Sequence, residues 1–160
     1  MEKIYMICID DQPTVLDAVI SDLEVFSDSF EIEACESASE AEELMEEVDQ
    51  NGDHVAILIC DQVMPGKSGT EFLAEVRKQD TFKSTGKILL TGQATHQDTI
   101  NAINQADIDK YIEKPWQKDT LIGYIKILLT RFLLDKGIDH MQYKDFLDQE
   151  TLLEKFKGSV

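Results

Sequence analysis

Five side chains of this sequence combine the groups that phosphoryl chemistry uses, and each stands within two residues of the end of a short apolar run. They are three carboxylates, a hydroxyl and an ammonium group: Asp10, Asp11, Asp61, Thr91 and Lys114. Three carboxylates brought together repel one another, and a hard divalent cation with oxygen ligands relieves that repulsion. Mg²⁺ is the natural cation, because it accepts one or two carboxylates together with water and phosphate oxygens.

The other two groups suit a bound phosphate. The ammonium group of Lys114 lies on a flexible stem and can pair with a phosphate oxygen. Thr91 offers a hydroxyl donor, and Gly92 beside it leaves space where a phosphate would stand. Together with a metal-activated carboxylate nucleophile, these groups predict a site that places a phosphoryl group on Asp61.

Apolar runs alternate with segments of helical periodicity, which predicts the elements that position these groups. The predicted strands are residues 4–9, 30–35, 55–60, 87–90 and 110–113. The predicted helices begin near Pro13, Ser39 (with Glu42 completing a capping box), Ser68 and Thr95, and the last covers residues 118–135. This order favours an α/β fold, a doubly wound five-stranded parallel sheet with helices on both faces. Ligands of such sheets bind at the carboxyl ends of the strands, where the five side chains converge.

The motifs resemble those of the two-component response-regulator receiver domain over roughly residues 1–134. The matching features are the acidic pair Asp10-Asp11, Asp61 with the Met-Pro-Gly-Lys-Ser-Gly run of residues 64–69, Thr91-Gly92, Tyr111 and Lys114-Pro115. Any one of them is common, but all of them in order at successive strand ends make a specific pattern. The resemblance implies a flavodoxin-like sheet with strand order 2-1-3-4-5.

The resemblance also implies a role for each residue of the site. Asp61 would accept the phosphoryl group from a histidine kinase or a histidine phosphotransfer protein. Asp11, Asp61 and the backbone carbonyl of Gln62 would hold Mg²⁺, with Asp10 acting mainly through water. Lys114 would pair with Asp61 and then with the phosphate. The implied function is phosphorelay signal transduction, not enzymatic turnover, although such a domain can catalyse its own dephosphorylation.

The resemblance implies a switch of two residues and two further positions that tune the lifetime of the phosphate. Thr91 would move toward the phosphate, and Tyr111 would rotate inward into the space that Thr91 leaves. This movement is a population shift between two states of one fold. Val63 and Gln93, two residues after Asp61 and Thr91, would tune the lifetime of the phosphate.

Two backbone features accompany these roles. The bond from Lys114 to Pro115 is usually cis in this family, and cis bonds are nearly confined to proline. Asp107 stands in a turn where the family often has glycine. Aspartate tolerates a left-handed backbone better than most residues, so we expect little harm from it.

Two other functions are weighed against this one. A haloacid-dehalogenase-type phosphatase also uses an aspartate nucleophile and Mg²⁺, but it needs a second aspartate two residues later. Val63 occupies that position and cannot transfer a proton. The alternative is a degenerate receiver that acts as a phosphorylation-independent interaction or dimerisation module, which failure to bind Mg²⁺ would favour.

Composition limits the classes of partner. The chain has 160 residues, suited to one globular domain, and a net charge of −17 that disfavours direct contact with nucleic acid or membrane lipid. It has no secretory signal and no apolar run near the roughly 20 residues of a spanning helix. Cys8, Cys35 and Cys60 lack metal-ligand or disulfide spacing, which predicts the reduced core thiols of a cytoplasmic protein.

The end of the chain carries more apolar surface than one sheet face covers. The last predicted helix has a wide apolar stripe, and after Gly137 a second amphipathic segment covers residues 139–157. We expect a receiver domain over residues 1–135 and a C-terminal helical extension over residues 136–160. The extension either folds back on its own domain, or forms with the last helix a homodimer surface or a connector of a longer protein.

Overall fold

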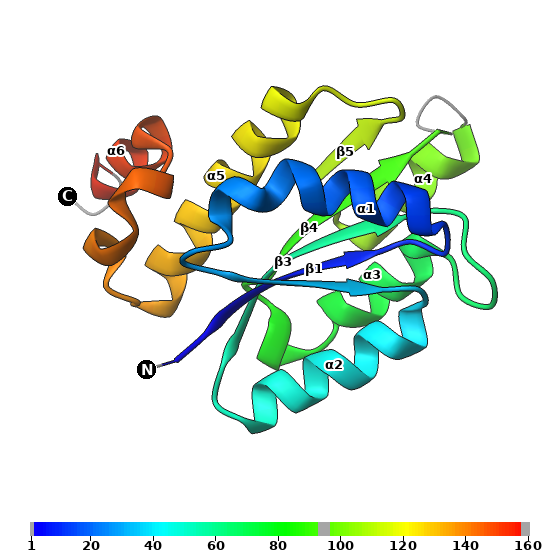
Figure 1. The fold of residues 1–160 in the computed structure, drawn as a ribbon, viewed down its shortest axis with the longest axis horizontal. Helices are drawn as coiled ribbons and strands as arrows, with labels where there is room; N and C mark the ends of the chain where they lie inside the picture. Colours follow the sequence, from blue (N-terminus) through cyan, green and yellow to red (C-terminus); the bar gives the residue numbers. More distant parts are fainter. Residues whose placement is uncertain (1, 93–96, 158–160) are drawn as a thin grey trace.

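The fold is the predicted one, a five-stranded parallel sheet between two layers of helices (Figure 1). The computed structural model describes residues 2–92 and 97–157. The strands are β1 (Ile4–Ile9), β2 (Glu31–Cys35), β3 (His54–Asp61), β4 (Gly86–Thr91) and β5 (Lys110–Glu113). Their order is β2-β1-β3-β4-β5, which confirms the flavodoxin-like order 2-1-3-4-5. The three central strands are almost wholly buried, as continuous apolar runs predict.

Helices divide the interior into two hydrophobic cores, one on each face of the sheet. One face carries α1 (Pro13–Asp22), the short helix η1 (Leu23–Phe26) and α5 (Lys118–Lys136). The other carries α2 (Ala38–Gln50), α3 (Gly69–Arg77), the short helix η2 (Asp80–Phe82) and α4 (Gln97–Ala106). Strand β1 serves both cores, because Met6 and Cys8 belong to the first and Ile7 and Ile9 to the second.

The register of the sheet brings the carboxyl ends of the strands to one edge. The residues paired there are Ile9 with Cys60, Asp61 with Leu90, and Thr91 with Glu113. Side chains that end these strands, or directly follow them, therefore stand side by side, as the sequence predicts.

The start of α2 differs from the prediction. The N-cap is Ser37, not Ser39, and its hydroxyl accepts the N–H of Glu40 at 3.1 Å. Two overlapping Ser-x-x-Glu patterns compete at this point, and the earlier one forms the helix start. The glutamate of the later pattern, Glu42, instead pairs with Lys67, which lies 2.7 Å away.

Other boundaries differ by a residue or two. Phe30 is not part of β2, because its N–H donates to the carbonyl of Phe26 in the preceding turn at 2.9 Å. Strands β3 and β4 are each longer than predicted, and α5 ends at Lys136. The predicted helix start at Thr95 lies outside the described residues. Ser68 caps α3 as predicted and accepts the N–H of Glu71 at 3.2 Å.

The C-terminal segment consists of two short helices that fold back on the domain. Gly137 ends α5 in a left-handed conformation, and η3 (His140–Phe146) and α6 (Gln149–Lys157) follow. The ring of Phe30 lies 5.1 Å from that of Tyr143 and 5.4 Å from that of Phe146. The hydroxyl of Thr130 on α5 accepts the N–H of Asp148 at 2.9 Å. Much of the surplus apolar surface of α5 is thus covered within the chain.

The three cysteines are free and buried, as predicted. Burial raises the pKa of Cys8 to about 12, with a smaller contribution from Cys35. Thiols with such a pKa are protonated at neutral pH and act as small apolar groups. Within the part of the chain that the structure describes, no helix is long and apolar enough to cross a membrane.

Removing an apolar anchor of the C-terminal segment should destabilise the whole domain. Leu147 is 7% exposed and belongs to the core on the α1–α5 face. We expect Leu147→Ala to lower the free energy of unfolding by about 2–3 kcal/mol, measured by urea denaturation. Leu153→Ala is the matched control, because Leu153 is 58% exposed and its truncation should cost less than about 0.5 kcal/mol. Equal losses of stability in the two variants would mean that the C-terminal segment is not docked on the domain.

Candidate functional site

The five predicted side chains reach the site from the ends of four strands, with Asp10 and Asp11 both following β1. Asp61 and Thr91 are the last residues of β3 and β4, and Lys114 directly follows β5. Asp10 directly follows β1, and its N–H donates to the carbonyl of Cys35 at the end of β2 at 3.1 Å. The N–H of Lys114 donates to the carbonyl of Thr91 at 2.9 Å. These backbone hydrogen bonds between neighbouring strand ends hold the residues of the site beside one another.

Three carboxylates meet at this edge. Oxygens of Asp10, Asp11 and Asp61 all lie within 4.8 Å of one another. Asp10 and Asp61 are 3% and 7% exposed, whereas Asp11 is exposed to solvent. One oxygen of Asp10 accepts the N–H of Gln12 at 2.9 Å, which fixes that carboxylate at the start of α1.

Lys114 is the cation of the cluster. Its ammonium group lies 2.9 Å from Oδ1 of Asp61 and 3.2 Å from Oδ2 of Asp10. One positive charge thus stands among three carboxylates, so the cluster keeps an excess of negative charge. Hard oxygen ligands with such an excess fit Mg²⁺.

Burial and charge act against each other on the two central groups. Burial raises the pKa of Asp61, and the nearby charge of Asp10 raises it further, while the hydrogen bond from Lys114 opposes both. Burial by itself lowers the pKa of Lys114, but the bond to Asp61 and the charges of Asp61 and Asp10 raise it above its ordinary value. Lys114 therefore remains charged, and the cost of a buried carboxylate at position 61 is only partly offset.

The loop from β3 to α3 is closed by Gln62, a contribution that the sequence analysis missed. Its side-chain oxygen accepts the N–H of Thr70 at 2.9 Å, and its amide nitrogen donates to the hydroxyl of Thr70 at 3.1 Å. Its backbone carbonyl accepts the N–H of Gly69 at 3.0 Å. This bond uses one lone pair of the carbonyl that the sequence analysis assigned to the metal, so the geometry favours the carboxylates as the main ligands.

Gly69 is a second contribution that the sequence analysis missed. A Cβ atom at this position would lie 2.2 Å from the backbone carbonyl oxygen of Asp61. Only glycine lets the start of α3 approach the end of β3 so closely. A Ser-Gly pair at a helix start after a strand-end aspartate is the signal for this role, although it does not reveal the approach.

Lys67 fastens the same loop to two helices. Its ammonium group pairs with Glu42 of α2 and with Glu75 of α3. Trp116 acts similarly on the other side of the site, where its indole N–H donates to Asp22 at the end of α1 at 2.7 Å. These contacts fix the segments that follow β3 and β5, and local sequence patterns do not predict them.

The predicted switch residues lie in contrasting surroundings. Thr91 is 1% exposed, whereas Tyr111 is 53% exposed on the neighbouring strand. Val63 is 59% exposed beside the site, and Gln93 lies outside the described residues. The Lys114–Pro115 bond is cis, and Asp107 has a φ of 54°, so both backbone features agree with the sequence analysis.

Sequence comparison places this chain among signalling regulators. The family model of the response regulator receiver domain matches residues 6–126. The hydrogenase transcriptional regulatory protein HoxA of Bradyrhizobium diazoefficiens is 34% identical over 112 residues, 70% of this chain and 22% of that protein. The response regulator Rre1 of Synechocystis sp. is 30% identical over 131 residues, 81% of this chain and 53% of Rre1. The chain thus spans between about a fifth and about half of these relatives.

Solved structures agree with the fold. A CheY-like response regulator receiver domain protein from Methanospirillum hungatei is 25% identical, with a TM-score of 0.70 over 84% of this chain and 99% of that one. The signal receiver domain of an HD domain-containing protein from Pseudomonas fluorescens has a TM-score of 0.73 over 86% of this chain and 94% of that one. Its identity is 22%, so this second likeness shows the fold alone.

Adding one methyl group at Gly69 should disrupt the packing of the start of α3 against the backbone of Asp61. Because the new Cβ collides with the backbone of Asp61, we expect Gly69→Ala to lower the free energy of unfolding by about 3 kcal/mol or more. Gly123→Ala is the matched control, since a Cβ there meets nothing within 4 Å and Gly123 lies inside α5. Gly123→Ala should raise the free energy of unfolding by about 0.5–1 kcal/mol, because alanine favours the helix more than glycine does. Urea denaturation of both variants checks this, and a Gly69→Ala variant of wild-type stability would contradict it.

Proposed function

This chain belongs to the response-regulator receiver-domain family, and we propose that Asp61 is its phosphoacceptor. Receiver domains act in phosphorelay signalling, generally without being enzymes, and interact with a phosphodonor such as a histidine kinase. The observation that carries the proposal is the position of Asp61 at the end of β3, 2.9 Å from Lys114 and among the carboxylates of Asp10 and Asp11.

The proposed transfer requires little of the chain beyond position and charge. A carboxylate oxygen of Asp61 forms a bond to the phosphorus of a phosphohistidine on a kinase or phosphotransfer protein. The phosphorus–nitrogen bond breaks, and the leaving imidazole takes a proton from solvent. Lys114, already paired with Asp61, follows the negative charge to a phosphoryl oxygen.

Asp11 and Asp61 are the proposed Mg²⁺ ligands, and Asp10 acts mainly through water. Mg²⁺, when bound, neutralises charge on the phosphoryl oxygens. Asp11 is exposed and can therefore exchange water for a ligand. The backbone carbonyl of Gln62 would complete the set, with the lone pair that Gly69 does not use.

Thr91 and Tyr111 are the proposed output switch. The buried hydroxyl of Thr91 turns toward the phosphoryl group, and the exposed ring of Tyr111 moves inward on the adjacent strand. Such a movement changes the surface of β5 and its neighbouring helices, where we propose that a partner or a second copy binds. Val63 and Gln93 set how fast water removes the phosphoryl group, including any hydrolysis that the domain itself catalyses.

The alternative function is a degenerate receiver that binds partners without phosphorylation. The complete set of carboxylates, lysine and threonine at the site supports the phosphorylated form instead. The domain division at residue 135, a homodimer through α5 and the C-terminal segment, and the absence of direct nucleic-acid or membrane contact belong to the same proposal.

Phosphorylation can be tested by intact mass measurement after incubation with acetyl phosphate and Mg²⁺. We expect one added phosphoryl group on the wild-type chain, because Asp61 is the nucleophile with a charged partner beside it. Asp61→Asn should remain unmodified, and so should wild-type protein in a metal chelator. Quenching of Trp116 fluorescence by Mg²⁺ provides an independent measure of binding. Absence of both an adduct and Mg²⁺ binding would establish the degenerate form.

The switch can be tested by NMR of the Tyr111 ring. With Mg²⁺ and beryllofluoride, a phosphoryl mimic, we expect the ring to become protected from a soluble paramagnetic probe. Thr91→Ala should still bind beryllofluoride, because Asp61 and Lys114 are intact, yet leave Tyr111 exposed. Equal protection of the ring in the variant would separate Tyr111 from Thr91 and contradict the coupling.

A further inference from the structure

The net charge of the chain is confined to one part of the sequence. Residues 4–66 contain 17 Asp and Glu residues and no Lys or Arg. The rest of the chain contains 15 acidic and 15 basic residues, so it is neutral. Residues 4–66 form β1, α1, η1, β2, α2 and β3, the half of the domain that ends at the edge strand β2. The molecule therefore has an acidic half and a neutral half.

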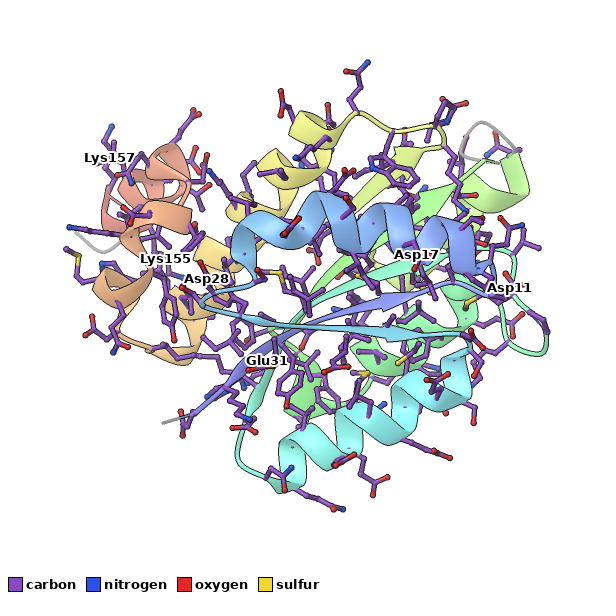
Figure 2. The ribbon with its side chains drawn as sticks, viewed as in Figure 1. Asp11, Asp17, Asp28, Glu31, Lys155 and Lys157 are labelled. Carbon is purple, nitrogen blue, oxygen red and sulfur yellow. The ribbon has the colours of Figure 1, made fainter. Side chains whose placement is uncertain are left out.

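A groove lies in the acidic half, between α1, η1 and β2, with a volume of about 610 Å³. Its apolar lining is formed by Ile20, Phe30 and Ile32, and acidic side chains on the same lining are Asp17, Glu24 and Glu31. All three carboxylates are exposed. In Figure 2, Asp17 lies on α1, with Glu31 near the start of β2 and Asp28 near the C-terminal segment.

The groove acids form no ion pair within residues 2–92 and 97–157. Among the ion pairs found in the described part of the molecule, none involves Asp17, Glu24 or Glu31. An apolar lining with unpaired carboxylates at its rim is complementary to a segment with apolar side chains on one face and Lys or Arg beside them.

The surface beside the groove already holds apolar side chains from another segment. Phe30 lines the groove and also contacts the rings of Tyr143 and Phe146 from the C-terminal segment. Phe26 contacts Phe146, with 5.7 Å between ring centroids. The groove is thus continuous with an interface at which this fold already accepts a short helical segment.

The edge of β2 favours a helix over an added strand as the occupant. Glu31 and Glu33 are exposed on this edge strand, and charged side chains on an edge strand discourage further strand pairing. A helix instead places apolar side chains into a groove at spacings of three and four residues.

We propose that the α1–β2 groove is a docking site for a basic amphipathic helix of a partner protein. Leucine-like side chains of that helix contact the partly exposed Ile20 and Ile32 above the buried ring of Phe30. Its Lys or Arg side chains pair with Asp17, Glu24 and Glu31. The site is separate from the cluster around Asp61, so the proposal stands whether or not Asp61 is phosphorylated.

The probe is a peptide of about 18 Leu and Lys residues with Leu on one helical face, long enough to form a helix once bound. It is titrated into the full chain at physiological salt, and binding is followed by NMR of the backbone amides. We expect the amides of Ile20, Ser27 and Ile32 to shift. A peptide of the same charge with Leu replaced by Ser should bind at least about tenfold more weakly, because it lacks the apolar contacts.

Two variants of equal net charge distinguish docking in the groove from nonspecific electrostatic attraction of the peptide to the acidic half. Asp17→Asn, Glu24→Gln and Glu31→Gln together should weaken peptide binding about tenfold. The matched variant carries Asp49→Asn, Glu43→Gln and Glu47→Gln, exposed positions on α2, and should change binding by about twofold or less because salt screens distant charges. All six are surface changes, and unchanged amide spectra elsewhere verify folding.

Equal weakening by the two variants would overturn the proposal, since the attraction would then be general. Shifts confined to another face would overturn it as well. If the chain alone forms a dimer in sedimentation experiments and the groove variant abolishes that dimer, a second copy is the occupant and the foreign helix is excluded.

Discussion

Crowding of three carboxylates around one ammonium group is the constraint on which this structure depends. Asp10, Asp11 and Asp61 reach one point because parallel strands end at a common edge. Lys114 reduces their repulsion but does not cancel it. The remaining negative charge favours a divalent cation, and the proposed phosphoryl group, which brings further negative charge, depends on such a cation. A site with fewer carboxylates would be more stable empty and less able to bind either.

The rest of the domain holds this unfavourable cluster in place. The N–H groups of Asp10 and Lys114 are bound to carbonyls of neighbouring strands. On the far side of Asp61, Gly69 permits close approach of α3, and Lys67 joins the loop to α2 and α3. Repulsion among the side chains is thus opposed by the backbone and by ion pairs outside the cluster.

The sequence predicts the parts of this arrangement that depend on local patterns. Continuous apolar runs indicate buried parallel strands, and from their ends follow the positions of Asp10, Asp61, Thr91 and Lys114. The predicted start of α2 was wrong, because two capping patterns overlap there. Ser37 and Glu40 form the cap, and Glu42 of the later pattern contacts Lys67 instead. That contact joins residues 25 positions apart, so no local pattern contains it.

Contacts between residues far apart in the sequence also explain why the role of Gly69 and the structure of the C-terminal segment were not predicted. The need for glycine at position 69 depends on the distance to another element. The C-terminal segment shows amphipathic periodicity, but its division into η3 and α6 depends on Asp148, whose N–H binds Thr130 and whose carboxylate accepts the N–H of Thr151 at 3.0 Å. The folding back of this segment on its own domain likewise depends on Phe26 and Phe30, whose rings contact that of Phe146.

The confinement of net charge to residues 4–66 makes the charge uneven across the sheet, with the excess of negative charge on the side of the β2 edge and little on the side of the β5 edge. Such a molecule rotates as it approaches a charged body, so a basic surface meets the β2 edge first. Two copies that meet with their β2 edges together repel each other. Charge therefore favours self-association that keeps the two β2 edges apart, for example with the β5 side of one copy against the β2 side of the next.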